Sequence, residues 1–418
     1  MKLTVISAIL CTAALPAFAD AKNDVLSNYA NIAEAAYGDA LTTARTLQVA
    51  VDALITDPSA ETQQAAKTAW LAARVPYLQT EVFRFGNPIV DAWEGQVNTW
   101  PLDEGLIDYV DVSYGGATDE NAFAALNVIA TPKFVLSGVD IDATTITPDL
   151  ISKTLQSADG VDTNVSTGYH AIEFLLWGQD LNGTAPGAGA RSFTDYAVGA
   201  DCTNGNCDRR AAYLQSATNL LVSDLEVMAA NWAPDGPARS SVMADADAGI
   251  LTILTGMGSL SYGELAGERM KLGLLLNDPE EEMDCFSDNT HNSQYYDGLG
   301  IQNIYLGTYT GVDGKVVSGP SLSELVAAAD PALNSQLTAD LATTMATLGA
   351  MKAAADAGMT YDQMIGVGND VGAALITASV DGLVKQTASV ERAVKALGVG
   401  AMALNGSDSL DNPDAVFQ

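Results

Sequence analysis

Small helix-forming residues recur through this chain at the spacing of an α-helix, and this pattern constrains the fold more than any other feature. Ala and Leu return at intervals of three and four residues, whereas alternating runs of β-branched residues are few and short. The Asp-Pro pairs at 57–58, 278–279 and 330–331 each place a side-chain acceptor at an N-cap and proline at the first helical position. Ser321 to Glu324 also fits a capping box. The sequence therefore predicts an all-α fold.

Several long helices are expected, with shorter ones between them. The long ones cover residues 22–55, 59–84 with a kink at Pro76, 208–232, 239–276, 331–357 and 366–398, and the shorter ones cover 119–129, 148–157 and 166–177. Helices of these lengths suit antiparallel bundles. Three long irregular stretches remain, at 85–118, 178–206 and 277–320, and such loops in a compact domain are usually functional or disordered.

The chain length and one strong break indicate two domains. A single core rarely grows past roughly 250–300 residues. The run from Trp232 to Pro237 interrupts two long helices with two prolines and a glycine, so the boundary is placed there. The expected parts are a signal peptide at 1–19, an N-terminal helical bundle at 20–235, a C-terminal helical bundle at 236–400 and a tail at 401–418.

The first 19 residues have the pattern of a secretory signal. Lys2 precedes an apolar run from Leu3 to Leu15, and Ala17-Phe18-Ala19 fits a cleavage site before Asp20. No later stretch reaches the roughly 20 uninterrupted apolar residues of a membrane span. The mature protein is therefore expected in the periplasm or elsewhere in the cell envelope, with no transmembrane segment.

The formal net charge of −33 limits the partners of this chain. Such a surface repels phosphate backbones and attracts cations, which excludes nucleic acid as a partner. Solubility alone also explains an acidic surface, so charge does not identify a metal site. Among the cysteines left after export, Cys202 and Cys207 bracket a turn-forming sequence, which favours a local disulfide over a metal pair. Cys285 is then unpaired, although each of the three possible pairings stays open.

The strongest chemical signal lies around His170. Only one other histidine exists, His291, so a three-histidine zinc site is impossible, and no HExxH motif occurs. The segment Gly168-Tyr169-His170-Ala171-Ile172-Glu173 continues into an apolar run that ends at Gly178, which predicts a buried helix. Positions i and i+3 share a helix face, so His170 and Glu173 can converge on one ion. A purely structural His–Glu pair would have the same spacing.

Three further acidic groups stand among large apolar residues or in polar turns. They are Glu81 in the segment 70–85, Asp103 and Asp108 in the segment 100–109, and a third group comprising Glu264, Glu268 and the run from Asp284 to His291. Helix capping, ion pairing with Arg74 or Arg84, and an ordinary surface loop explain most acids of this kind.

These segments together resemble the imelysin family. GYHAIE matches its GxHxxE signature, and the blocks at 70–85, 100–109, 264–270, 286–291 and 300–305 follow in the family's order. The resemblance implies two helical-bundle domains with a site at their interface. It implies His170 and Glu173 as metal ligands, with Glu81 and Asp103 as additional carboxylates. It also implies the following neighbours: Arg74, Asp108, Glu264, Arg269, Ser287 and Asp288.

Three functions fit these residues. The first is an envelope protein that binds a divalent or trivalent metal ion or a metal chelate for iron handling or uptake, together with an envelope iron-transport component. One imidazole and several carboxylates suit iron, with zinc or calcium as alternatives. The second is a metallopeptidase in which Glu173 or Glu81 is the general base, since the family includes a protein described as an insulin-cleaving protease. The third is a non-catalytic scaffold that binds a partner protein.

Overall fold

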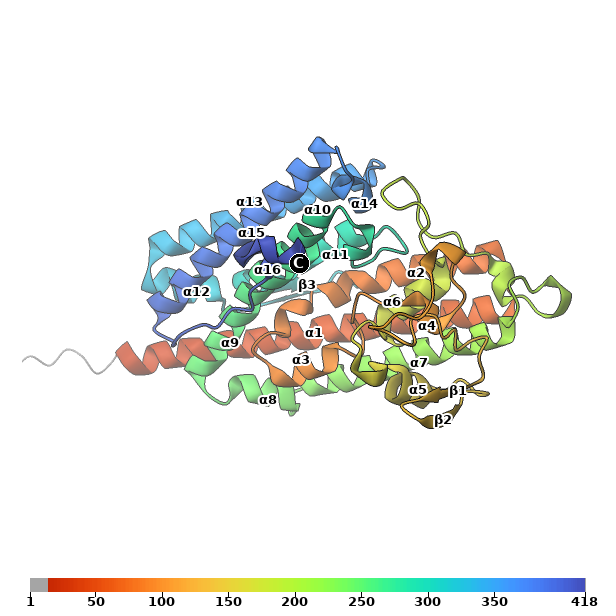
Figure 1. Cartoon of the computed structure of the whole chain (residues 1–418). Coiled ribbons are helices and arrows are strands. Elements are labelled where there is room, and N and C mark those ends of the chain that lie inside the picture. Colours follow the sequence, from red (N-terminus) through yellow and green to blue (C-terminus); the bar gives the residue numbers. More distant parts are fainter. Residues whose placement is uncertain (1–13, 418) are drawn as a thin grey trace, which may run out of the picture.

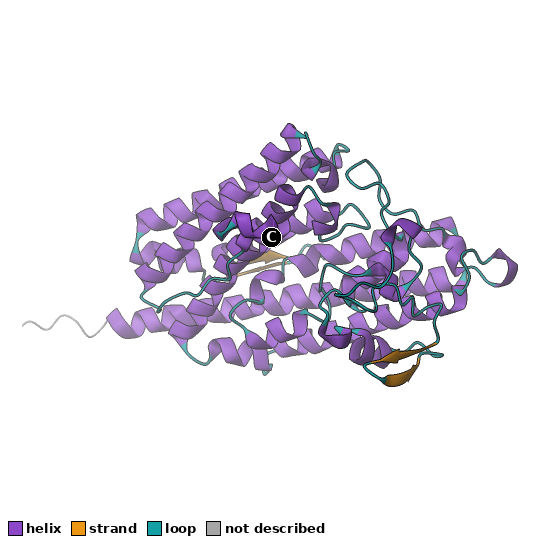
Figure 2. Ribbon diagram, in the orientation of Figure 1, coloured by secondary structure: helices purple, strands orange, loops and turns teal. Residues whose placement is uncertain are grey.

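The protein is almost entirely helical, as the sequence predicts (Figures 1 and 2). The computed structural model describes residues 14–417, so most of the expected signal peptide lies outside the described residues. The helices are α1 (Ala14–Thr56), α2 (Ala60–Leu78), α3 (Pro88–Glu94), α4 (Glu104–Ile107), α5 (Pro148–Leu150), α6 (Gly168–Trp177), α7 (Cys207–Trp232), α8 (Pro237–Met243), α9 (Ala246–Ser259), α10 (Leu272–Leu276), α11 (Thr290–Leu306), α12 (Leu322–Ala329), α13 (Pro331–Asp356), α14 (Tyr361–Ile365), α15 (Asp370–Leu397) and α16 (Asp408–Asp411). A π-helical segment, η7 (Leu260–Lys271), joins α9 to α10, and a single 3-10 turn, η1 (Glu81–Phe83), follows α2.

Two short antiparallel hairpins are the strands of the described chain. In the first, β1 (Lys133–Leu136) pairs with β2 (Val139–Asp142), with Lys133 opposite Asp142. In the second, β3 (Thr308–Thr310) pairs with β4 (Val316–Ser318), with Thr308 opposite Ser318. Neither hairpin forms part of a larger sheet, so the strands do not alter the fold class.

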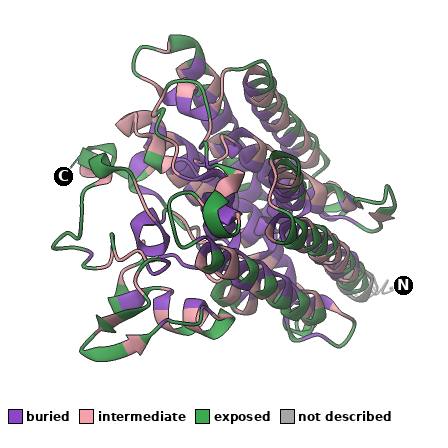
Figure 3. Cartoon of the chain, turned by 90° about the vertical axis from the view of Figure 1, so that its right-hand side faces the viewer, coloured by how far each residue is buried: buried purple, intermediate pink, exposed green. Residues whose placement is uncertain are grey.

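The helices enclose two hydrophobic cores, and α1 contributes to both. Its residues from Val25 to Tyr37 pack in one core with α9, α11, α13 and α15. Its residues from Ala40 to Leu54 pack in the other with α2, α6 and α7. Figure 1 shows α1 running along the molecule with α2 and α7 beside it. Helices α13 and α15 lie at the upper left of the same view. Viewed along the helices, the buried residues concentrate between them and the exposed ones face outward (Figure 3). The division of the chain into separate domains at 235–236 stays a prediction.

Helix capping explains several boundaries. Ser321 and Glu324 form the expected capping box at α12, and Asp330 caps α13 ahead of Pro331. At the start of α2 the prediction was wrong by two residues, because Ser59 rather than Asp57 is the N-cap. The expected helix 239–276 is also broken: Asp245 caps a new helix, and η7 interrupts the α-helical pattern after Ser259.

Two larger predictions were wrong. Residues 119–129 form turns instead of a helix, because the backbone N–H groups of Asn127, Val128 and Ile129 donate to the carbonyls of residues 105–107. The stretch 277–320 contains the 17-residue helix α11, although it was expected to be irregular. Gly300 lets α11 pack closely against the backbone of Gln79, so a tertiary contact accompanies a helix whose sequence is rich in Gly and Asn.

Within residues 14–417, every helix is either too short or too polar to span a lipid bilayer.

Candidate metal centre

Helix α6 carries the GYHAIE segment and is buried along its whole length. Its first residue, Gly168, has φ +78°, and a Cβ there would overlap the carbonyl of Val97. The next amide, Tyr169 N–H, donates to the same carbonyl at 2.8 Å. Glycine is therefore required at the first position of the motif, because only glycine combines this backbone angle with so close an approach.

His170 and Glu173 lie one turn apart on α6 and contact each other, as their spacing predicts. The distance from His170 Nδ1 to Glu173 Oε2 is 3.1 Å. A second carboxylate oxygen, Asp284 Oδ1, lies 3.7 Å from the same nitrogen. One donor atom from each of these three residues falls within 4.8 Å of the others, and the three side chains are at most 1% exposed. The structure thus forms a buried His–Glu–Asp cluster.

Hydrogen bonds from neighbouring residues orient both carboxylates. Glu173 Oε1 accepts from the backbone N–H of Ser287 at 3.0 Å and from its hydroxyl at 2.6 Å. Asp284 accepts from the Arg74 guanidinium, with Nη2 2.8 Å from Oδ1, and from Asn289 and Ser293. Ser287 and Arg74, which the resemblance implies as neighbours of the site, are therefore in direct contact with two of its three members.

Burial and charge set the protonation of the cluster. Burial, followed by the charge of Arg74, lowers the pKa of His170 to about 3, so the imidazole is neutral. Burial and the nearby Asp284 charge raise the pKa of Glu173 well above its ordinary value. Burial alone would also raise the pKa of Asp284, but Arg74 outweighs it and holds that pKa below its ordinary value. Asp284 is thus paired with an arginine, while Glu173 forms no salt bridge with any Lys or Arg among residues 14–417.

The donor set fits a small metal ion. Ligand bonds of about 2.0–2.2 Å place adjacent donors roughly 3.0–3.5 Å apart. The distances of 3.1 and 3.7 Å from His170 Nδ1 to the two carboxylates are close to this range. The neutral imidazole of His170 and the ionised carboxylate of Asp284 are forms that bind metals, whereas Glu173, whose pKa is raised, would release a proton when a metal binds. A divalent cation would stabilise the ionised form of Glu173.

Glu81, Glu264 and Arg269 meet at a different cluster, which joins the 3-10 turn η1 to the segment η7. Arg269 lies within 2.9 Å of Glu81, within 2.6 Å of Glu264 and within 2.8 Å of Asp297. Glu81 is therefore already paired with an arginine, and it lies outside the group of donors that includes His170. The structure brings these predicted residues together with one another but not with the GYHAIE helix.

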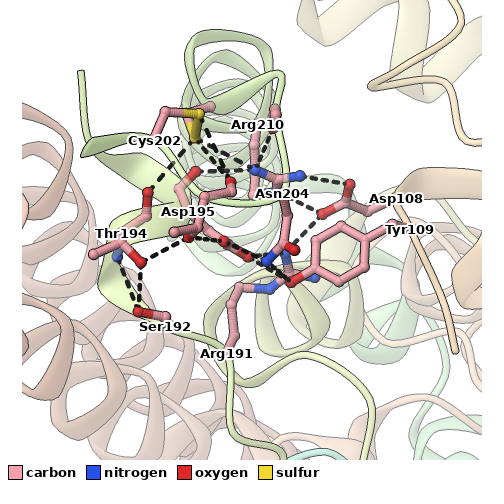
Figure 4. Close-up of a disulfide and its surroundings, with 12 residues drawn as sticks. Asp108, Tyr109, Arg191, Ser192, Thr194, Asp195, Cys202, Asn204 and Arg210 are labelled. Atoms are coloured by element: carbon pink, nitrogen blue, oxygen red, sulfur yellow. Dashed lines mark hydrogen bonds and ion pairs between the residues drawn. A yellow bond between two sulfur atoms is a disulfide. The ribbon is translucent and has the colours of Figure 1, made fainter. Parts of the chain in front are cut away.

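Asp103 and Asp108 belong to two further networks. Asp103 accepts hydrogen bonds from Tyr114, Thr163 and Asn121. Asp108 lies between two buried arginines, 2.7 Å from Arg191 and 2.6 Å from Arg210. Figure 4 shows this second network beside the disulfide. Neither aspartate belongs to the group of close donor atoms that contains His170.

Asp288 follows Ser287 and adopts a left-handed backbone conformation with φ +54°. Burial, followed by the charge of Asp362, raises its pKa to about 7, and one of its oxygens, Oδ1, is buried and has no hydrogen-bond partner within residues 14–417. It follows Ser287, which contacts Glu173, but it is not one of the three grouped donors.

Sequence reasoning missed Asp284 as a candidate ligand. This residue lies 111 positions after Glu173, and no local spacing connects the two. Its only signal was its place in the polar run from Asp284 to His291. The cysteine prediction, in contrast, is confirmed: Cys202 and Cys207 form a disulfide, and Cys285 is free.

The geometry defines an all-α protein with two helical cores and a buried His–Glu–Asp cluster on a GxHxxE helix. The chain belongs to the imelysin family, whose model matches residues 33–390. No curated protein matches the sequence. Solved structures that share the fold include the following two. One is a protein from Parabacteroides distasonis described as an iron-regulated protein A precursor, 18% identical, with a TM-score of 0.65 over 90% of this chain and 95% of that one. The other is an imelysin-like protein from Psychrobacter arcticum, 16% identical, with a TM-score of 0.60 over 94% of this chain and 100% of that one.

Proposed function

We propose that this imelysin-family protein is exported to the cell envelope and binds one metal ion, with iron preferred, for iron handling or uptake. His170, Glu173 and Asp284 would hold the ion. The observation that carries the proposal is the convergence of one imidazole nitrogen and two carboxylate oxygens within 4.8 Å of one another in the interior. An unpaired carboxylate buried in this way is costly, and a cation removes the cost.

The choice of metal follows from the donors. One nitrogen and two oxygens are chemically harder ligands than thiolates, and most zinc sites contain more imidazole than this one does. The donor set therefore favours Fe or Mn. One solved structure with this fold is described as iron-regulated, which agrees with iron as the first ion to test. Glu81 and Asp103 are left out of the proposed ligand set because neither belongs to the group of close donor atoms that His170 forms with Glu173 and Asp284.

Peptidase activity receives less support from the geometry. When bound, the metal would act as a Lewis acid or would activate a water, and a peptide would have to reach it. The three donor side chains are at most 1% exposed, so a peptide cannot reach them in this conformation.

Metal analysis of protein isolated from the periplasm without chelators tests the proposal. The wild type should contain about one equivalent of metal, whereas His170→Gln and Glu173→Gln should lose it while keeping helical circular dichroism. Asp103→Asn is the matched control, since it removes a half-buried carboxylate from another hydrogen-bond network and should retain the metal. Equal metal content in folded His170→Gln, Glu173→Gln and wild-type protein would overturn the proposal.

A further inference from the structure

The segment η7 is a π-helix of 12 residues, whereas π-helices in proteins are mostly single turns inside α-helices. Its last bond shows the π pattern, because the N–H of Leu272 donates to the carbonyl of Gly267, five residues earlier. A π-helix of this length is rare, so contacts from the surrounding structure are needed to maintain it.

The segment 402–411, called the strap below, lies against η7 and includes α16 (Figure 1). Two hydrogen bonds join the strap to η7. The hydroxyl of Ser409 donates to the carbonyl of Gly267 at 3.0 Å, and the hydroxyl of Tyr262 donates to Asp411 Oδ1 at 2.6 Å. The strap therefore holds η7 both at its backbone and at a side chain.

Three glycines allow the strap to lie this close. A Cβ on Gly263 would be 2.3 Å from the carbonyl oxygen of Asn405, and a Cβ on Gly267 would be 2.3 Å from the Cβ of Ser407. A Cβ on Gly258, at the end of α9, would be 2.6 Å from a side chain of the strap. No other residue type fits at these positions while the strap stays in place.

The spacing of these glycines depends on the π form of η7. Gly258 and Gly267 both contact the strap although they are nine positions apart. In an α-helix, nine residues make about two and a half turns, which would place the two glycines on opposite sides. With i→i+5 hydrogen bonds a turn takes roughly 4.4 residues, so nine residues complete about two turns. The strap therefore fits η7 as a π-helix and would not fit it as an α-helix.

The π form of η7 also positions Arg269. This side chain lies 2.9 Å from Glu81 and 2.8 Å from Asp297. If η7 relaxed to an α-helix, Arg269 would rotate by roughly half a turn relative to Leu260. It would then lose its contacts with both acids.

The strap itself is weakly anchored. Within the described segment 402–411, the buried residues are Ser407 and Ser409, which are polar and small. Its larger apolar residues Met402, Leu404 and Leu410 are only half-buried. A segment that buries so little apolar surface opens at a lower free-energy cost than the hydrophobic cores do.

We infer that the strap is a detachable segment that holds η7 in its π form and thereby keeps Arg269 in its cluster. Its release removes one wall of a pocket of about 660 Å³, which the strap forms together with Glu268 and Leu272. Release also rearranges Glu264 and Arg269, which line a neighbouring pocket of about 540 Å³. The two hydrophobic cores stay folded. The inference goes beyond the proposed metal function and does not depend on it.

Hydrogen–deuterium exchange of the full chain tests the inference, with mass spectrometry of peptides that cover 260–271 and 402–411. The variant is Gly267→Ala. If the strap had no role, alanine would stabilise the helix and slow exchange in 260–271. If the strap maintains η7, the added Cβ displaces Ser407, and exchange in both segments should rise by about tenfold or more.

A second variant and a control separate the strap from a local effect on the helix. Tyr262→Phe removes only the hydroxyl that contacts Asp411, so both segments should again exchange faster, by a smaller factor. Gly349→Ala is the matched control, because a Cβ there meets only Tyr295, at 3.8 Å, and both segments should exchange as in the wild type. Slower or unchanged exchange of 260–271 in Gly267→Ala, or unchanged exchange of 260–271 in Tyr262→Phe, would overturn the inference.

Discussion

Arg74 is the residue whose replacement tests the electrostatics of the candidate metal centre most directly. Its side chain is 1% exposed, contacts Asp284 and Asn98, and packs on the rings of Tyr169 at 5.0 Å and Tyr77 at 5.6 Å. Arg74→Gln removes the charge that matches Asp284. Breaking a buried pair in this way costs about 3–5 kcal/mol, so the free energy of unfolding without metal should fall by that amount.

The same replacement should strengthen metal binding. Arg74 Nη2 lies 2.8 Å from Asp284 Oδ1, the oxygen nearest to His170, so the guanidinium and an ion compete for one atom. Two unit charges about 4 Å apart interact by about 4 kcal/mol at an effective dielectric constant of about 20. Relief of even a third of this repulsion raises the metal affinity by about tenfold. Arg74→Gln should therefore gain more stability from metal than the wild type does.

Urea denaturation with and without saturating Mn²⁺ measures both effects. Arg210→Gln is the matched control, because Arg210 is equally buried and lies 2.6 Å from Asp108 in a network apart from the cluster. Arg210→Gln should lower the free energy of unfolding by a comparable amount. Mn²⁺ should raise the free energy of unfolding of this variant by no more than it does for the wild type. If Arg74→Gln gains no more from Mn²⁺ than Arg210→Gln does, the reasoning is refuted.

Two further predictions concern other parts of the fold. Replacing Cys202 and Cys207 together by Ser should lower stability by about 2 kcal/mol, because the disulfide closes a short loop; calorimetry under oxidising conditions measures this, and an unchanged melting temperature would contradict it. Burial, followed by the charge of Glu280, raises the pKa of Glu104 from 4.5 to about 7. Between pH 4.5 and pH 7 Glu104 is therefore protonated in the folded state and ionised in the unfolded state. The stability that this group contributes is fully present below pH 4.5 and is lost as the pH rises through 7. The loss amounts to about 3 kcal/mol. In Glu104→Gln the urea concentration at the denaturation midpoint should vary less with pH between pH 5 and 8 than it does in the wild type. A pH dependence identical to that of the wild type would contradict the assignment.

The spacing of apolar residues predicted the helices that are determined by nearby sequence. The long helices α1, α7, α13 and α15 follow their apolar spacing and caps, and their ends fall within a few residues of the expected positions, apart from the first residues of α1. Helix α11 could not be found in this way, because Gly298 and Gly300 weaken its helical propensity and its packing partners come from other segments.

The candidate site likewise combines one contact that is local in sequence with others that are long-range. The pairing of His170 with Glu173 follows from a spacing of three residues on one helix, so it is legible in the sequence. The partners of Glu81, Asp103 and Asp108 are tertiary, and so is the position of Asp284. A buried acid and a ligand look alike in sequence, because the arginine that pairs with the acid, such as Arg269 for Glu81, stands 188 residues away.

Helix α1 spans both hydrophobic cores without interruption. A continuous helix is stiff along its axis, and bending it sharply requires a break that α1 lacks. The two ends of the molecule are thus joined by a rod, so they cannot swing apart about a flexible linker. Access to anything held between the two cores must therefore come from displacements smaller than a hinge motion of one core against the other.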